Sequence, residues 1–177
     1  MNIYSRLRDH AAQRPDKVAI RFKDTAITYR ELFSLTGKLG TALRDAGISR
    51  GDNVAVMLPN IPEFIISYMG AIGIGAVAVP VNPTFTSREL AHILKDSEAK
   101  GIVIEENNFS TYGDIQDRFP LNAVITTGES GNFSQWTAGA DRGICEDMDL
   151  DDLAQALNQP TDQIGRASCR ERVFSSV

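Results

Sequence analysis

Continuous apolar runs alternate with helix-like spacing of apolar side chains through the middle of the chain. Three runs have the length and composition of strands buried on both faces of a parallel sheet: 54–58, 77–81 and 101–104. Pro62, which suits a first helical turn, follows the first run, and the capping-box sequence Thr86-Ser87-Arg88-Glu89 follows the second. The order strand, helix, strand, helix, strand predicts a right-handed, doubly wound α/β unit, layered around a mostly parallel sheet of βαβ connections.

The two helices between these strands are each predicted to turn one apolar face toward the core. The first helix carries large apolar side chains at helical spacing: Phe64, Ile65, Tyr68, Met69 and Ile72. The second helix presents Leu90, Ile93 and Leu94. Gly73 and Gly75 are expected to close the first helix.

The N-terminal part shows local signals of its own. Ile3, Leu7 and Ala11 recur every fourth residue, which predicts a short amphipathic helix that ends before Pro15 and packs on the domain. Segment 18–28 is typical of a β-hairpin with an Asp at its turn.

A second capping box, Thr28 with Glu31, then opens a helix. Its leucine stripe is expected to face the core: Leu32, Leu35, Leu39 and Leu43. Gly47 supplies a left-handed stop.

Beyond residue 104 the pattern is weaker. The expected elements are a polar loop at 105–108, a helix at 110–117, a strand at 123–126, a long surface loop at 127–145 and a short helix at 149–158. The acidic residues of 146–152 lack the Asp-x-Asp-x-Asp-Gly order of a calcium loop. We interpret them as a solvated face and not as a metal site.

Several short motifs occur in the order and spacing of a known family. They are Ile-Thr-Tyr-Arg-Glu-Leu at 27–32, Leu58-Pro59-Asn60 with Glu63-Phe64, the glycines of 73–77 running into Pro80-Val81-Asn82-Pro83, Arg88-Glu89-Leu90 and Leu94-Lys95-Asp96-Ser97. Over residues 10–105 the chain resembles the first half of the large domain of the adenylate-forming acyl-CoA synthetases. The resemblance implies that residues 1–163 are an incomplete N-terminal part of that AMP-binding domain.

In that family a carboxylate attacks the α-phosphate of ATP to give an acyl-adenylate, and the thiol of CoA then displaces AMP. The resemblance implies ATP, Mg²⁺ and CoA as cofactors of the intact parent protein, with none expected for the chain alone. The family's phosphate loop ending in Pro-Lys-Gly, its Thr-Glu pair, its ribose-binding Asp and its C-terminal Lys have no counterpart here. No catalytic, cofactor-binding or metal residue is therefore assigned.

Two segments look like nucleotide-binding loops without matching one. The stretch 126–131 has no Lys and contains Glu129, so we interpret it as a surface turn. The glycines of 70–75 follow a helix instead of preceding one, and are expected to pack that helix closely on the sheet. Among the charged residues of the family motifs, we assign Glu63 as a helix-start acid and Glu89 as a capping partner, and place neither these nor Arg88 near substrate.

The segment 82–90 looks more like the fatty-acyl and aryl-acid CoA ligase branch than the peptide-synthetase branch, in which an Asp usually stands at the position of Asn82. The expected substrate of the parent, an acid–thiol ligase, is a medium- or long-chain fatty acid. Two alternatives stay open: an adenylation domain that loads a carrier protein, and a truncated α/β module without catalytic function. The chain alone is expected to be inactive, and to be poorly soluble because a sheet edge and a core face lack their cover.

Composition and charge limit the classes of binding partner that are expected. The net charge is −5, from 18 Lys+Arg against 23 Asp+Glu, and no basic cluster with aromatic residues is present, so nucleic acid is not expected as a partner. Cys145 and Cys169 lack metal-ligand spacing, and the charged N-terminus does not read as a signal peptide, which favours the cytoplasm. The uncharged segment 64–81 is interpreted as a buried helix and strand instead of a membrane span, because glycines and Pro80 interrupt it. Peripheral contact with a membrane and the oligomeric state stay open.

The sequence of the last segment differs from that of the region before it. Residues 164–173 resemble the translation of a common short-read sequencing adaptor joined in frame, and they follow an acidic region with basic residues. We interpret 164–177 as a non-native tail, with a natural basic tail as the alternative.

Overall fold

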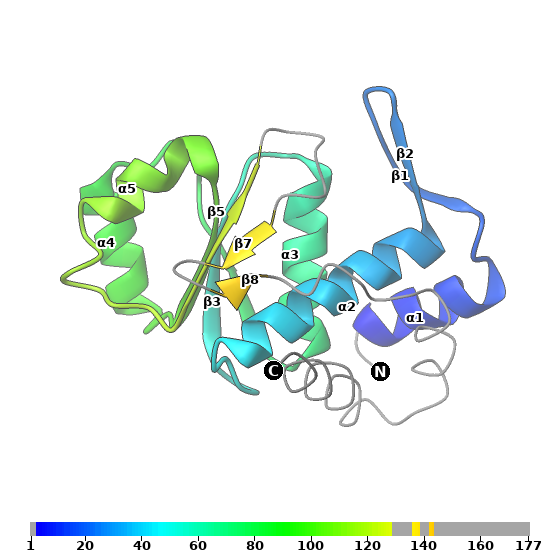
Figure 1. The fold of residues 1–177 in the computed structure, drawn as a ribbon, viewed down its shortest axis with the longest axis horizontal. Helices are drawn as coiled ribbons and strands as arrows, with labels where there is room; N and C mark the ends of the chain where they lie inside the picture. Colours follow the sequence, from blue (N-terminus) through cyan, green and yellow to red (C-terminus); the bar gives the residue numbers. More distant parts are fainter. Residues whose placement is uncertain (1–2, 129–135, 139–141, 144–177) are drawn as a thin grey trace, which may run out of the picture.

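Four parallel strands form the centre of the fold (Figure 1). The computed structural model describes residues 3–128, 136–138 and 142–143. The parallel strands are β3 (Asn53–Met57), β4 (Val77–Pro80), β5 (Gly101–Glu105) and β6 (Ala123–Thr127). They lie in the order β4-β3-β5-β6, and β3 pairs in parallel with both β4 and β5. The predicted α/β unit with a mostly parallel sheet is confirmed.

Two short strands continue the sheet beyond β6. β7 (Trp136–Ala138) pairs antiparallel with β6, and β8 (Arg142–Gly143) pairs antiparallel with β7. The prediction of a surface loop over 127–145 is wrong for these two strands and for Thr127, because the edge of β6 offers backbone groups that pair whatever the side-chain pattern. The predicted helix at 149–158, the acidic residues of 146–152 and the segment 164–177 lie outside the described residues.

Helices cover both faces of the sheet (Figure 1). On one side lie α1 (Ile3–Gln13), α2 (Tyr29–Asp45) and α3 (Pro62–Gly73), and on the other lie α4 (Ser87–Asp96) and α5 (Phe109–Gly113). Along β3, Val54 and Val56 join the core on the α2 and α3 side, whereas Ala55 and Met57 join the core on the α4 side. Burial on both faces explains why this strand is apolar at every one of these positions.

The buried face of α3 is not the predicted one. The residues that face inward are Glu63, Ile66, Ser67, Gly70 and Ala71. Of the residues predicted to be core, Ile65 is 39% exposed and the other four are half-buried, of which Phe64, Met69 and Ile72 pack against the core. The prediction failed because α3 is apolar nearly all round, so periodicity does not select a face. Small side chains select it, since they let α2 approach.

The glycines of α3 pack against helices and not, as predicted, against the sheet. A Cβ atom at Gly70 would lie 2.9 Å from Leu39 Cδ2 and 3.0 Å from the carbonyl oxygen of Thr36, both in α2. A Cβ atom at Gly73 would lie 2.8 Å from the ring of Tyr4 in α1. The predicted end of the helix is confirmed, since α3 ends at Gly73 and Gly75 has a φ of 81°.

β4 is an edge strand and not the strand buried on both faces that its apolar sequence predicted. Val77 is 49% exposed, and Pro80 is exposed as well. Proline lacks an N–H and is confined to edge strands, strand starts and bulges, so its presence fits this place in the sheet. An apolar run predicts a strand but not its rank in the strand order.

The N-terminal elements follow the prediction closely. α1 buries Tyr4, Leu7 and Ala11 beside α2, although Ile3 points outward and is 53% exposed. β1 (Val18–Phe22) and β2 (Thr25–Thr28) form the expected antiparallel hairpin, seen at the top right of Figure 1. In α2 three of the four predicted leucines are buried, and Leu35 packs against the same core.

The uncharged segment 64–81 divides into α3 and β4, as interpreted from the sequence. Among the described residues, no helix is long and apolar enough to cross a membrane. After β5, a 3₁₀ turn (η1, Glu106–Asn108) leads into α5, which is shorter than the helix predicted at 110–117. The chain turns back toward the sheet there, and the hydroxyl of Tyr112 donates a hydrogen bond to the carbonyl of Phe119 at 3.0 Å.

Candidate functional site at the carboxyl edge of the sheet

The strand order reverses beside β3. The connection through α3 leads from β3 to β4, and the connection through α4 returns past β3 to β5, on the opposite face of the sheet. In open parallel sheets, ligands bind at the carboxyl ends of the strands next to such a reversal. We therefore define the carboxyl edge as the four segments that follow the parallel strands, and take it as the candidate site: 58–61, 81–86, 106–108 and 128.

The turn from β3 into α3 is built by backbone groups. The N–H of Ile61 donates to the carbonyl of Pro59 at 2.8 Å, and the N–H of Phe64 donates to the carbonyl of Ile61 at 3.0 Å. Pro62 occupies the first turn, as predicted, and the N-cap residue Ile61 makes no side-chain hydrogen bond. The N-terminus of α3 therefore lacks the side-chain cap found at α2 and α4.

Glu63 lies in this first turn and is 1% exposed. Neither of its carboxylate oxygens has a hydrogen-bond partner among the described residues. The predicted position at the helix start is confirmed, and the positive end of the helix dipole favours an anion there. Its burial was not predicted, and burying a carboxylate without hydrogen-bond partners is costly. A lone acid before a long uncharged segment is the sequence signal that could have shown this.

A second unpaired polar group lies at the end of β6. The hydroxyl of Thr127 is buried and has no partner among the described residues. Thr127 pairs in register with Glu105, the last residue of β5, and Glu106 follows directly. The stretch 126–131 was predicted as a surface turn, yet Thr126 and Thr127 end a strand, and 129–131 lie outside the described residues.

The connection from β4 to α4 is held by local hydrogen bonds. Asn82 Oδ1 accepts from the N–H of Thr84 at 3.0 Å, and from its hydroxyl at 2.9 Å. The N–H and hydroxyl of Thr86 each donate to Glu89 Oε2 at 2.8 Å, which confirms Glu89 as a capping partner. These donors hold the pKa of Glu89 below its ordinary value. Arg88, one residue earlier, is exposed on α4.

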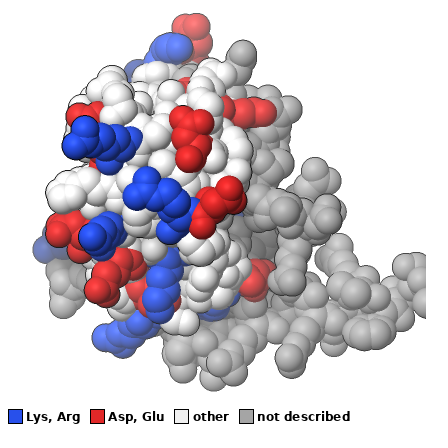
Figure 2. Space-filling view, turned by 90° about the vertical axis from the view of Figure 1, so that its left-hand side faces the viewer, with Lys and Arg blue, Asp and Glu red and all other residues white. Residues whose placement is uncertain are grey.

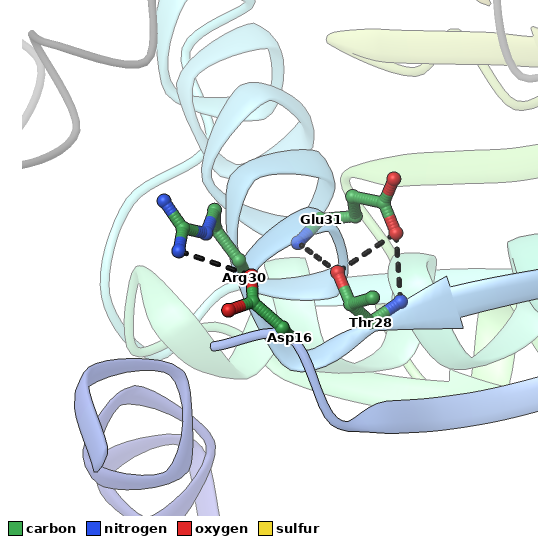
Figure 3. Close-up of polar contacts among 4 residues, drawn as sticks. All are labelled: Asp16, Thr28, Arg30 and Glu31. Carbon is green, nitrogen blue, oxygen red and sulfur yellow. Dashed lines mark hydrogen bonds and ion pairs between the residues drawn. The ribbon is translucent and has the colours of Figure 1, made fainter. Parts of the chain in front are cut away.

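A capping box also lies at the start of α2 (Figure 3). The N–H of Thr28 donates to Glu31 Oε2 at 2.7 Å, the hydroxyl of Thr28 donates to the same oxygen at 2.8 Å, and the pKa of Glu31 is lowered by these bonds. Arg30 beside it pairs with Asp16 at 3.1 Å, an exposed contact (Figure 3). Both capping boxes fix where helices start, so neither carboxylate is available for chemistry.

An ion pair and a surface hollow lie away from the carboxyl edge. Lys100 pairs with Asp52 at 2.7 Å near the amino ends of β5 and β3, and this contact, with the N–H of Ser49, lowers the pKa of Asp52. A small surface hollow lies among α1, α2 and α3, lined by Tyr4, Thr36 and glycines of α2 and α3. Small residues at a helix crossing account for that hollow, and burial raises the pKa of Tyr4 there.

The described part of the carboxyl edge offers no cationic side chain to the triphosphate of ATP. Its four segments contain no Lys or Arg, while the nearby carboxylates are those of Glu63, Glu105 and Glu106. Phosphate binding needs cations or free amide donors. Among residues 3–128 and the two short strands, no group of three or more His, Cys, Asp or Glu side chains is placed to hold a metal ion.

The surface beside α4 and α5 carries both signs of charge. Figure 2 looks onto this side of the molecule and shows Lys and Arg interspersed with Asp and Glu. The exposed charges on α4 are Arg88, Glu89, Lys95 and Asp96. A mixed surface of this kind is typical of a solvent-facing helix and offers no single-sign patch for a polyanion.

A doubly wound sheet with its reversal beside β3 defines an α/β domain of the kind that binds ligands at its carboxyl edge. A model of the AMP-binding enzyme family matches residues 7–161, and the chain belongs to this family. The family resemblance read from the motifs is confirmed.

The chain is 40% identical over 101 residues to a long-chain-fatty-acid–CoA ligase from Bacillus subtilis, covering 57% of this chain and 18% of that ligase. Its fold is similar to that of the anthranilate CoA ligase AuaEII in complex with anthranoyl-AMP (TM-score 0.69, 24% identity, 76% of this chain and 26% of that chain). It is also similar to ATP-bound MatB from Rhodopseudomonas palustris (TM-score 0.65, 28% identity, 72% of this chain and 25% of that chain). The chain thus spans about a fifth of the B. subtilis ligase and about a quarter of each of these two solved chains.

Proposed function

We propose that the chain is the N-terminal part of an AMP-forming acyl-CoA synthetase that activates a fatty acid. The observation that carries this proposal is family membership over residues 7–161, together with the 40% identity to a fatty-acid CoA ligase. In the proposed reaction the carboxylate oxygen attacks the α-phosphorus of ATP, pyrophosphate leaves, and an acyl-adenylate forms. The thiol of CoA then attacks the acyl carbon, AMP leaves, and a thioester results.

The cofactors ATP, Mg²⁺ and CoA belong to the parent protein in this proposal. ATP is supported by the ATP-bound MatB structure, and an adenylate is supported by the anthranoyl-AMP complex of AuaEII. The described carboxyl edge offers no cationic side chain to a triphosphate, and we place the cationic groups that bind it in the rest of the parent. The 177-residue chain supplies part of the scaffold and is expected to be inactive by itself.

A fatty acid is the proposed substrate, and CoA, not a carrier protein, the proposed acceptor. Both choices are supported by the ligase of B. subtilis and by the Asn at position 82, where the resemblance associates an Asp with the peptide-synthetase branch. The cytoplasm is the proposed compartment, and no nucleic acid partner is proposed.

The test is ATP–pyrophosphate exchange by the parent protein, produced from source DNA that extends beyond the codon of Gln163. We expect exchange that depends on a fatty acid and is largest at medium or long chain length, followed by release of AMP only when CoA is added. Exchange stimulated by an amino acid and not by a fatty acid would contradict the proposed substrate. Transfer of the acyl group only to a carrier protein would contradict CoA as the proposed acceptor. No exchange with any carboxylic acid would refute the proposal.

We also propose that residues 1–163 are native and that 164–177 are a non-native tail. The adaptor-like sequence of 164–173 supports this division. Re-sequencing the source DNA across the codons of Thr161 to Cys169 tests it. We expect the reading frame to continue from Gln163 into a Thr-, Ser- and Gly-rich segment, and a confirmed Ile164-Gly165-Arg166 sequence would contradict it.

A further inference from the structure

α3 has a second apolar face that the described fold covers only in part. Ile65, Tyr68, Met69 and Ile72, hereafter the outer stripe, recur at i, i+3, i+4 and i+7, so they line one side of the helix. Ile65 is 39% exposed, and the other three are half-buried. The ring of Phe64 stacks against that of Tyr68, with centroids 6.2 Å apart, and extends the apolar surface.

The opposite face of α3 already supplies its packing on this domain. Ile66 is fully buried in the core, and Gly70 lies against Leu39 and Thr36 of α2. Met69 and Ile72 are partly buried and pack against that core, whereas Ile65 and Tyr68 are not among the residues that do. A helix that is apolar all round is a buried helix, so the outer stripe needs a cover of its own.

We infer that the outer stripe is a docking surface for the part of the parent polypeptide that lies outside these 177 residues. The inference rests on the proposed function only in requiring a longer parent. The chain covers 18% of the length of its ligase relative, so most of the parent is available as the occupant. The stripe carries no charge, and residues 64–81 carry none either, so the surface that covers it is apolar and uncharged.

The edge strand that follows α3 is also incompletely covered. β4 is the edge strand next to β3, and α3 leads into it. Val77 at its start is 49% exposed, which among the described large apolar side chains is exceeded only by Ile3. A helix face and an adjoining strand edge, both apolar, are what a domain core exposes when only part of it is present.

A membrane surface is a poorer occupant on chemical grounds. Helices that lie on membranes carry Lys and Arg on their polar face. α3 contains no Lys or Arg, and its one charged residue, Glu63, is buried and acidic. Anionic lipid would gain no electrostatic attraction from this helix.

The test is thiol labelling at matched positions on α3 and α4. Single variants Ile65→Cys, His92→Cys and Ile66→Cys are made in two backgrounds. One is the 177-residue chain with Cys145→Ser and Cys169→Ser, and the other is the parent protein with its native cysteines replaced by Ser. His92 is exposed on α4 and serves as the control for free access, while Ile66 is fully buried and reports that the domain is folded. The rate of reaction with a maleimide is measured for each.

We expect the thiol of Ile65→Cys to react readily in the 177-residue chain and roughly tenfold or more slowly in the parent, because a docked surface must open before reagent enters. The thiol of His92→Cys should react at one rate in both proteins, and that of Ile66→Cys should be slow in both. Equal rates for Ile65→Cys in both proteins overturn the inference. Failure of the pyrophosphate exchange leaves this readout untouched, because labelling measures access and not activity.

Three further outcomes would also overturn it. Protection of Ile65→Cys in the 177-residue chain that grows with protein concentration would identify a second copy as the occupant. Protection of the parent only on addition of vesicles of phosphatidylcholine with phosphatidylglycerol would identify a membrane. Source DNA that ends at Val177 would leave no parent to cover the stripe.

Discussion

α3 and α4 flank the same sheet from opposite faces, and each starts at the carboxyl edge after a parallel strand. α4 begins with a complete capping box, buries Leu90, Ala91 and Leu94, and turns charged side chains outward. α3 begins without a side-chain cap and buries a carboxylate that has no partner among the described residues. It leaves the outer stripe only partly covered.

The difference separates a helix specified by its own sequence from one specified by its surroundings. The start of α4 is fixed by bonds between residues three apart, and its faces are fixed by apolar and charged periodicity. α3 has neither a capping box nor an alternation of apolar and charged faces. Its position depends on close contact with α2 on one side and, as we infer, on contact with the rest of the parent on the other.

The largest effect is expected at the contact between α3 and α2. Gly70→Ala would put a Cβ atom against Leu39 and against a backbone oxygen that is not free to move, so we expect the free energy of unfolding to fall by about 1–3 kcal/mol. Gly37→Ala in α2 is the control, because no heavy atom lies within 4 Å of its added Cβ. That control should gain about 0.5–1 kcal/mol from helix propensity. Urea unfolding at low protein concentration measures both, and a neutral Gly70→Ala would contradict close packing.

The first-turn acids of the two helices should respond with opposite sign. Glu63→Met replaces a buried carboxylate, which has no hydrogen-bond partner in the described part of the chain, by an apolar side chain of similar length. We therefore expect the free energy of unfolding to rise by about 1–3 kcal/mol. Glu89→Met removes a capping partner of α4 and should lower stability. The midpoints of urea unfolding compare them. A loss of stability on Glu63→Met in the 177-residue chain would mean that Glu63 has a partner there.

The cap of α4 should also give a pH-dependent contribution. Thr86→Ala should lower the free energy of unfolding by about 1 kcal/mol at neutral pH, whereas Thr86→Ser, which keeps the hydroxyl, should lower it far less. The pKa of Glu89 is below its ordinary 4.5 in the folded state, so on acidification the unfolded state takes up the proton first. The contribution of the box is thus present above pH 4.5 and is lost as the pH falls through the folded pKa.

Unfolding curves of Thr86→Ala, Thr86→Ser and the unaltered chain over pH 3–7 test this. The gap between the unaltered chain and Thr86→Ala should narrow toward the acidic end. A gap that stays constant over the whole range would show that the hydroxyl of Thr86 caps α4 without help from the ionised Glu89.

The sequence predicted best what short-range chemistry decides. Both capping boxes, the hairpin and the four parallel strands were predictable, because spacing within a few residues or a continuous apolar run specifies each. The rank of β4 at the edge of the sheet was not, since an apolar run says nothing about strand order. β7 and β8 were missed because backbone pairing with β6 determines them, and their polar, glycine-rich setting gives no strand signal.

The candidate site was less predictable than the fold. The position of Glu63 at a helix start could be read from Pro62 beside it, but its burial depends on which face of α3 meets α2. That choice follows from three-dimensional fit at Gly70, which no periodicity in a helix apolar all round expresses. The same ambiguity assigned the outer stripe to the core, which is where the parent protein is inferred to place it.

The smallest effect on stability, and the sharpest on association, is expected at Ile65. Ile65→Lys in the 177-residue chain puts a charge on a side chain that is already 39% exposed, so the free energy of unfolding should change by no more than about 0.5 kcal/mol. Association should weaken, because the predicted poor solubility of the chain arises from uncovered apolar surface of this kind. His92→Lys on α4 should change neither quantity. Sedimentation velocity over a range of concentrations, together with urea unfolding, measures both.

In the parent protein the same Ile65→Lys would bury a lysine and should clearly lower the midpoint of thermal unfolding. One substitution is therefore expected to reduce the association of the short chain and to destabilise the parent. If it leaves the association of the short chain unchanged, the outer stripe is not the surface that makes the chain aggregate.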